Sequence, residues 1–307
     1  MAQSLEAGVW GVIPTPFHGS TQDVDADSLA GLAEHYEAAG AVGLTALGVF
    51  GESLALTAGE RRLVLETIVE ATTLPLVVGI SSLATRPAIE EILAAQDVAG
   101  TRVRAVMVQV NSAGADAVVN HLQAIHRATA AQIVLQDYPV ASGVGIGGAA
   151  LAEVVNRCSF VVAVKAEAPP TSVAIAQLTA AVRVSVFGGL GGQGLLDELA
   201  AGAAGAMTGF SFPEALVACV RAWQSDGYES ARDVLTPFLP LINFEQQAKI
   251  ALSVRKELFK NRGLIKESSV RAPAAPFPEV LRDGVNRHLA EAGRALDNLA
   301  ATTAGSI

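Results

Sequence analysis

Cysteine and histidine are scarce in this sequence of 307 residues. The two cysteines, Cys158 and Cys219, are far apart and have no CxxC spacing, which argues against a disulfide framework and against a zinc site. The five histidines form no i,i+4 pair, and no cluster of carboxylates offers a cage for a hard metal ion. We therefore expect no metal, and two unpaired thiols suit the reducing cytoplasm.

Excess basic charge and long hydrophobic runs are also missing. Asp and Glu (30) outnumber Lys and Arg (21), the net charge is -9, and no run of basic residues can follow a phosphate backbone, so nucleic acid is not an expected partner. Gly, Pro or charged residues interrupt every apolar run before membrane-spanning length, and no basic segment followed by an apolar one opens the chain. We expect a soluble cytoplasmic protein whose partner is a small molecule and not a membrane.

Short apolar runs alternate with longer Ala-rich amphipathic stretches, and 51% of the residues are hydrophobic. The short runs predict buried strands, and the longer stretches predict helices. The rhythm is typical of a parallel (β/α)8 TIM barrel, and an open doubly wound sheet is the competing architecture. The eight expected strands are 9–13, 43–48, 75–80, 103–110, 132–137, 160–165, 183–187 and 204–208.

The strand signal stops after about residue 212, and amphipathic helices such as 245–261 and 278–300 follow. We expect the barrel to occupy residues 1–212. The helices of 213–307 are expected to form a C-terminal layer packed on the barrel, so that the chain is a single structural unit.

Lys165 ends the expected strand 160–165, whose apolar side chains suit a strand covered on both faces. A buried ammonium is costly to keep charged, because removal from water favours the neutral amine, and a neutral amine is a nucleophile toward ketones. Glu167, two residues further, points to the same side because strand side chains alternate. The pair offers an amine for imine formation and a carboxylate for proton transfer. The alternative is a strand-end lysine whose head reaches water.

In a barrel the active site lies at the carboxyl ends of the strands, so polar residues there are candidates. The second strand leads into a glycine-bracketed turn, Gly48–Ser53, whose free amides and Ser53 hydroxyl can hold a carboxylate or simply form a tight turn with a helix cap. Gln136 and Tyr138 end the fifth strand on one face, and Asp137 lies on the other. These residues do not decide which face is the lumen.

Two further motifs have weaker support. Gly189, Gly191 and Gly194 fit the GxGxxG pattern of a pyrophosphate-binding turn, although no acidic residue ends the next strand to bind a ribose; a barrel phosphate site and a loop lying close to a bound acid are alternatives. Ser253 and Lys256 form an SxxK pair on an amphipathic helix without partner motifs. That context favours a solvated helix face over serine chemistry.

Together, these residues on this strand rhythm resemble the dihydrodipicolinate synthase / N-acetylneuraminate lyase superfamily of class I aldolases, over almost the whole chain. The resemblance implies a barrel with C-terminal helices, usually tetrameric, that binds pyruvate or another 2-keto acid as an imine on the sixth-strand lysine. It implies no metal and no cofactor. The motifs that carry it are Pro14-Thr15-Pro16-Phe17, Gly48-x-x-Gly51-Glu52, Pro139 four residues before Gly143, Lys165, Gly188-Gly189, Gly205 and Arg271-x-Pro273.

The chain departs from the members that make dihydrodipicolinate in four features. It has Val49 and Phe50 where they usually carry two hydroxyl residues, Gln136 for a catalytic tyrosine, Ala141 for an arginine that binds the second substrate, and no aromatic pair near Gln109. The combination of Gln136-Asp137-x-Pro139 with Lys165-x-Glu167 looks more like the 2-keto-3-deoxy sugar acid dehydratases of this superfamily, in which the glutamate and glutamine do the acid–base work.

The resemblance implies a Schiff-base lyase with Lys165, Glu167 and Gln136 as catalytic residues. Dehydration and C–C cleavage run through the same imine, so both stay open. A condensation of pyruvate of the 4-hydroxy-tetrahydrodipicolinate synthase type and a 2-keto acid-binding barrel without turnover also stay open. The expected substrate-binding residues are Gly48, Phe50, Gly51, Glu52, Ser53, Tyr138, Gly188, Gly189 and Thr208.

Overall fold

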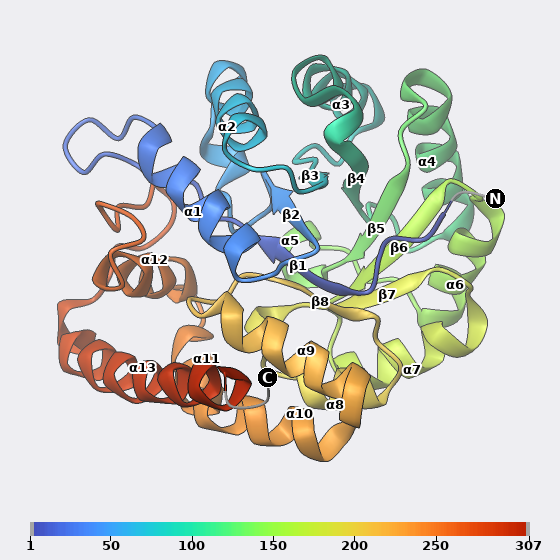
Figure 1. Ribbon diagram of the computed structural model, residues 1–307. Helices are drawn as coiled ribbons and strands as arrows, with labels where there is room; N and C mark the ends of the chain where they lie inside the picture. Colours follow the sequence, from blue (N-terminus) through green and yellow to red (C-terminus); the bar gives the residue numbers. More distant parts are fainter. Residues whose placement is uncertain (1–2, 305–307) are drawn as a thin grey trace.

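Eight parallel strands close into a barrel in the computed structural model, which describes residues 3–304 (Figure 1). Each strand pairs with the next one along the chain, and β8 pairs with β1. All eight predicted strands are confirmed, with ends within two residues of the expected ones, and the closed ring excludes the open sheet. The strands are β1 (Gly8–Val12), β2 (Gly43–Ala46), β3 (Leu76–Gly79), β4 (Val103–Gln109), β5 (Ile133–Asp137), β6 (Val161–Ala166), β7 (Ser185–Gly188) and β8 (Gly205–Thr208).

Helices cover the outside of the barrel. Two of them begin at well-formed caps: Asp25 accepts a 3.1 Å hydrogen bond from the Ser28 amide, and Thr57 and Glu60 form a capping box. The helices of the barrel are α1 (Ala26–Ala38), α2 (Ala58–Ala71), α3 (Thr85–Ala99), α4 (Ala115–Thr129), the short α5 (Pro139–Ser142), α6 (Gly148–Arg157), α7 (Thr171–Ala181), α8 (Leu195–Ala200) and α9 (Pro213–Asp226).

Apolar side chains fill both sides of the strand ring. Inside the barrel, Trp10, Val77, Met107 and Met207 are among the buried residues that close the lumen below the strand ends. Outside it, alternate strand residues pack under the helices. The filled lumen leaves room for a site only at the carboxyl ends of the strands.

The C-terminal helices group on one side of the barrel, beside α1 and α9 (Figure 1). One hydrophobic cluster joins Val9 of β1 and Ala206 of β8 to Leu258 and Val285 of these helices, so the two parts share a core. The added helices are α10 (Tyr228–Leu235), α11 (Leu239–Glu245), α12 (Ala251–Asn261) and α13 (Arg282–Ala304).

The single helix predicted for 245–261 is wrong at its start. α11 ends at Glu245 and α12 begins at Ala251, with Lys249 at a φ of 71° between them. The hydrophobic pattern continues across this break, because both helices bury one face, and so periodicity alone does not reveal it. The break places the first turn of α12 beside the barrel mouth.

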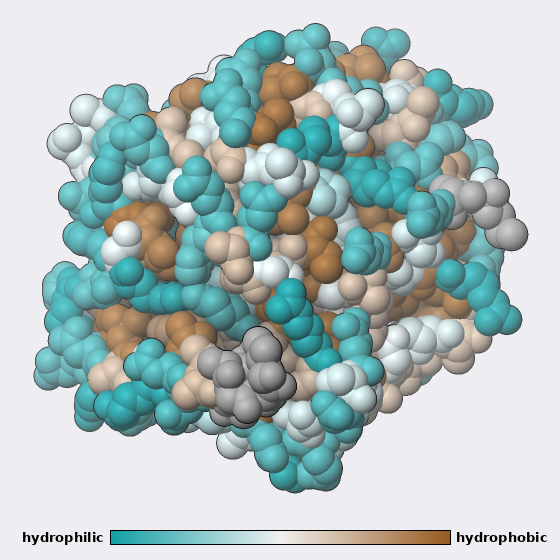
Figure 2. Space-filling model, viewed as in Figure 1, coloured by the Kyte–Doolittle hydropathy of each residue, from teal (hydrophilic) through white to brown (hydrophobic). Residues whose placement is uncertain are grey.

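On the face in Figure 2, hydrophilic residues predominate and hydrophobic ones form separate patches between the helices. None of the described helices is both long and apolar enough to span a bilayer.

Candidate active site

A cavity of about 210 Å³ opens at the carboxyl ends of the strands. Its wall comes from strand ends and from the C-terminal layer, so elements far apart in the sequence meet there. Among the predicted site residues it brings together Gly48, Phe50, Gln136, Tyr138, Lys165, Glu167 and Thr208.

Lys165 and Glu167 form an ion pair inside this cavity, with 3.2 Å between Lys165 Nζ and Glu167 Oε2. Both residues are buried, at 6% and 5% exposure. Gln136 Nε2 donates a 2.7 Å hydrogen bond to the same Glu167 oxygen. The amine expected to form an imine, the carboxylate expected to move protons and the amide expected to assist therefore lie in one contact group.

The end of β5 presents both Gln136 and Tyr138 to the cavity. Asp137 lies on the opposite face, as alternation predicts, and is buried in the wall. Burial raises the pKa of Asp137 to about 6, and the nearby Glu167 adds to the shift. The face that the sequence left open is therefore assigned: Gln136 and Tyr138 face the lumen.

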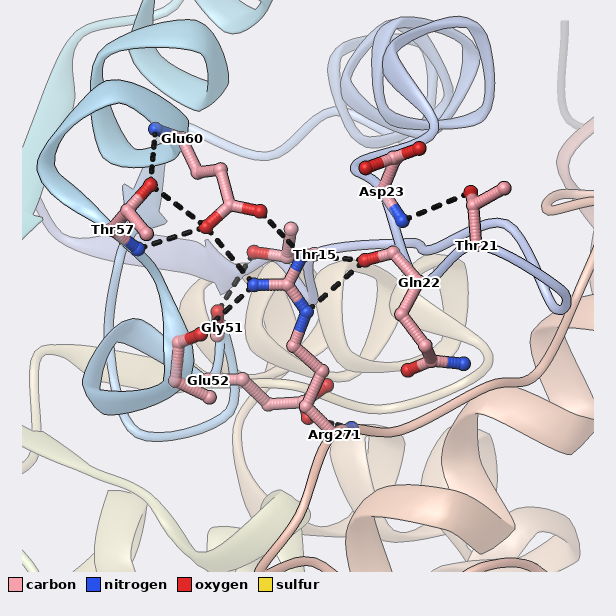
Figure 3. Close-up of polar contacts among 10 residues, drawn as sticks. Thr15, Thr21, Gln22, Asp23, Gly51, Glu52, Thr57, Glu60 and Arg271 are labelled. Carbon is pink, nitrogen blue, oxygen red and sulfur yellow. Dashed lines mark hydrogen bonds and ion pairs between the residues drawn. The ribbon is translucent and has the colours of Figure 1, made fainter.

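Contacts from other segments of the chain hold the turn after β2, as Figure 3 shows. Thr15 Oγ1 donates to the Gly51 carbonyl at 2.7 Å, and Glu52 Oε2 accepts from the Arg271 amide at 2.8 Å. The Arg271 guanidinium in turn donates to the Ala55 carbonyl at 2.8 Å and pairs with Glu60. Two segments far from this turn in the sequence, around Thr15 and Arg271, thus help to fix it.

This arrangement separates the predicted turn residues. Gly48 and Phe50 line the cavity that holds Lys165, whereas Glu52 and Ser53 line a neighbouring cavity of about 440 Å³ that shares Gly48 and Gln136 with it. The amides of Gly51 and Glu52 donate to the Gly48 and Val49 carbonyls at 3.0 and 3.1 Å. Two amides predicted to be free for a carboxylate therefore already have acceptors within the turn.

The glycine-rich loop after β7 approaches the site, but not as predicted. Leu190 and Gly191 line the cavity, rather than Gly188 and Gly189. Gly191, at a φ of 68°, donates its amide to Thr208 Oγ1 at 2.7 Å. A Cβ built at Gly189 would lie 2.2 Å from Glu167 Oε1, so this glycine makes room for the carboxylate.

The GxGxxG interpretation as a pyrophosphate cradle is wrong. The third glycine, Gly194, lies against a second buried acid, Glu198, because a Cβ there would be 3.0 Å from Glu198 Oε1. The closed barrel lacks the doubly wound sheet in which this cradle occurs, and α8, which follows the loop, has only six residues.

Glu198 is buried behind the wall and accepts a 2.7 Å hydrogen bond from Thr171 Oγ1. Burial raises its pKa to about 7, and repulsion from Glu167 and Asp197 adds to this. Its Oε2 has no hydrogen-bond partner among residues 3–304. A carboxyl group in this setting favours its protonated form.

The solvated helix face predicted for Ser253 and Lys256 is also wrong, since both side chains are fully buried. Lys256 Nζ pairs with Glu52 and donates to the Ser269 carbonyl at 2.8 Å, and Ser253 Oγ donates to the Ile250 carbonyl at 3.1 Å. Burial lowers the pKa of Lys256 to about 8. The ion pair of Lys256 with Glu52 connects α12 to the turn after β2, and the contacts of Ser253 support no serine chemistry.

The structure adds site residues that the sequence did not indicate. Thr45 of β2 lines the cavity, and its buried hydroxyl has no partner within the described part of the chain. Gln246 and Arg255 reach the cavity from the C-terminal layer. No local pattern marks them, because only the fold brings that layer over the barrel mouth. No group of three or more potential metal-ligating side chains occurs between residues 3 and 304.

Comparisons with known proteins identify the family of this chain. The model of the dihydrodipicolinate synthetase family matches residues 6–292. An L-2-keto-3-deoxyarabonate dehydratase of Azospirillum brasilense is 30% identical over 303 residues, which is 95% of either chain. A 4-hydroxy-tetrahydrodipicolinate synthase of Methanopyrus kandleri is 27% identical over 238 residues, 75% of this chain and 79% of the relative.

The crystal structure of a dihydrodipicolinate synthase from Rhodopseudomonas palustris superimposes with a TM-score of 0.86 at 29% identity, covering 94% of this chain and 99% of that one. The family match spans the barrel and most of the C-terminal layer. This chain is therefore a lyase that belongs to the dihydrodipicolinate synthetase family.

Proposed function

We propose that this lyase dehydrates a 2-keto-3-deoxy sugar acid through an imine on Lys165. The observation that carries the proposal is the contact of Lys165 with Glu167, and of Glu167 with Gln136, in the cavity at the carboxyl ends of the strands. Similarity to an L-2-keto-3-deoxyarabonate dehydratase over 95% of the chain supports the same substrate class.

The reaction begins when Glu167 takes a proton from the Lys165 ammonium, so that the neutral amine attacks the C2 ketone. Glu167 then returns this proton to the carbinol oxygen, which leaves as water, and the glutamate is again a carboxylate. The protonated imine then accepts the electron pair freed at C3 when Glu167 removes the C3 proton. Glu167 then gives that proton to the C4 hydroxyl group, which leaves as water. Hydrolysis of the imine frees the product and restores Lys165.

The substrate carboxylate would lie at the turn after β2, where Gly48 and Phe50 line the cavity together with Thr208. Gln136 would hold the carboxylate of Glu167 toward the reacting carbons through its 2.7 Å hydrogen bond.

The test combines trapping with product analysis. Borohydride added during incubation with five- and six-carbon 2-keto-3-deoxy acids should fix an adduct on Lys165, located by peptide mass spectrometry, and the free product should have lost one water. Lys165→Arg should abolish both signals, while Lys260→Arg, an exposed position on α12, should leave them unchanged. An adduct on Lys256, the other deeply buried lysine, or turnover by Lys165→Arg would refute the proposal. Pyruvate as the product would instead indicate C–C cleavage.

We also propose that the chain forms a homo-oligomer, a tetramer by resemblance. Light scattering during gel filtration tests this, and a single species of 31.5 kDa would contradict it.

A further inference from the structure

The C-terminal layer supplies polar groups to the cavity that the proposed mechanism does not use. Arg255 of α12 and Gln246, just beyond α11, both line it. Arg255 is only 7% exposed, so its charge lies in the cavity wall and not in bulk water. These two residues are on the side of the β7–β8 loops, where Leu190, Gly191 and Thr208 complete the wall.

The guanidinium of Arg255 is fixed from two directions. Its Nε donates to Glu245 Oε2 at 3.0 Å, and its central carbon lies 4.9 Å from the centroid of the Phe50 ring. Glu245 is itself fully buried and accepts from the Ser211 amide at 3.3 Å. An arginine held in this way presents its donors in a set geometry, which favours specific recognition of oxygen atoms.

Gly191 leaves the space that these side chains fill. A Cβ built there would lie 1.5 Å from Gln246 Nε2 and 2.8 Å from Arg255 Nη2. The amide nitrogen of Gln246 is buried and has no hydrogen-bond acceptor within residues 3–304. Leaving a buried donor without an acceptor destabilises a protein, and a ligand oxygen would satisfy it.

This wall therefore offers donors without net charge, because Glu245 balances Arg255. Hydroxyl oxygens suit such a wall better than a second carboxylate, whose charge would have no uncompensated partner there. We propose that Arg255 and Gln246 bind the hydroxyl-bearing end of the substrate chain, remote from the C1 carboxylate, and select sugar-derived keto acids over pyruvate. This inference rests on the proposed function, and it specifies which end of the substrate Arg255 and Gln246 bind.

Two variants test the proposal. Gln246→Leu removes a donor without breaking a charge pair, and Arg255→Met removes the guanidinium while keeping an apolar stem over Phe50. The kcat/KM for a five-carbon 2-keto-3-deoxy acid should fall about 10-fold in the first and about 10- to 100-fold in the second, mainly through KM. Borohydride trapping of pyruvate on Lys165 should keep its wild-type yield, because pyruvate has no distal hydroxyl.

Arg262→Met is the matched control, since Arg262 also stacks on a phenylalanine, Phe212, and pairs with a glutamate, Glu214, but does not line the cavity. It should leave kcat/KM unchanged. Equal loss of pyruvate trapping and of kcat/KM in Arg255→Met would assign Arg255 to the C1 carboxylate and overturn the proposal. Unchanged kcat/KM in both variants would overturn it as well. A preference of the wild-type protein for a six-carbon keto diacid would also overturn it, because the distal group bound would then be a carboxylate and not a hydroxyl.

Different results would refute the imine function and the role of Arg255 and Gln246. If the wild-type protein gives no adduct on Lys165 with any 2-keto acid, the imine function falls, and this inference falls with it. If the wild-type protein gives the adduct and the variants discriminate as the wild type does, only the role of Arg255 and Gln246 is lost.

Discussion

Gln136 Nε2 donates a 2.7 Å hydrogen bond to Glu167 Oε2, so the neighbouring strands β5 and β6 share one carboxylate. The same oxygen lies 3.2 Å from Lys165 Nζ. An amide that donates to a carboxylate fixes its direction. The glutamine therefore keeps Glu167 ready to accept a proton beside the amine.

Replacement of Glu167 should separate imine formation from proton transfer. We expect Glu167→Gln to lower kcat by about 10²- to 10⁴-fold, because it removes the general base but keeps a side chain of similar shape. Pyruvate should still be trapped on Lys165 by borohydride. Steady-state kinetics and intact mass measure the two effects. Asp137→Asn is the control, because it changes a buried carboxylate on the opposite face of the wall. Unchanged turnover in Glu167→Gln would contradict the role of Glu167 as the base, whereas trapping of pyruvate with no product from either the wild type or the variant would favour a binding barrel.

The buried pair of Lys256 and Glu52 should contribute strongly to stability. Lys256→Met leaves the Glu52 carboxylate buried without its cation, and we expect the free energy of unfolding to fall by about 3–5 kcal/mol. Adding Glu52→Gln should recover part of this loss, because the uncompensated charge disappears. Urea unfolding of both variants measures the coupling. Lys260→Met, which breaks the exposed pair with Glu267, should cost less than about 1 kcal/mol, and equal losses at both lysines would refute this account.

The fold and the contact of Lys165 with Glu167 were predictable because their signals are local. Short apolar runs between breakers predicted each strand, and alternation placed Lys165 and Glu167 on one side. Lys256 was missed because its partner Glu52 lies 204 residues away, and a helix pattern does not report a distant carboxylate. Arg255 was missed for the same reason. Its role depends on the break between α11 and α12, which the continuous hydrophobic pattern of 245–261 conceals.

Glu198 should make stability fall as pH rises. Its pKa is raised from 4.5 to about 7 by burial, so the folded protein keeps a proton that the unfolded chain has lost between these pH values. The stability gained from the neutral form is full below pH 4.5 and is lost as pH rises through about 7.

Glu198→Gln should remove this component, because the amide is neutral at every pH. At pH 8 the variant should be more stable than the wild type by up to about 3 kcal/mol, since each tenfold change in proton affinity corresponds to about 1.4 kcal/mol. Free energies of unfolding measured from pH 4 to 8 provide the test. Asp197→Asn, the exposed neighbour on α8, should change the slope only slightly, because its repulsion is the smallest contribution to the shift. Parallel curves for Glu198→Gln and the wild type would mean that Glu198 is already ionised in the folded protein.

Gly189 should be required for the position of the Glu167 side chain and not for binding of the 2-keto acid. A Cβ at Gly189 would lie 2.2 Å from Glu167 Oε1 and 2.7 Å from its Cγ, so the whole side chain has to move in Gly189→Ala. Displacement by about an ångström is enough to lower proton transfer by about 100-fold, and we expect kcat to fall accordingly while pyruvate trapping persists. Gly59→Ala is the control, because nothing lies within 4 Å of a Cβ on that helix. It should keep wild-type kcat and gain up to about 1 kcal/mol of stability. Wild-type kcat in Gly189→Ala would show that turnover does not depend on this position of Glu167. Tyr138, the ionisable side chain at the end of β5 that lines the cavity, would then be the next candidate for the acid–base role.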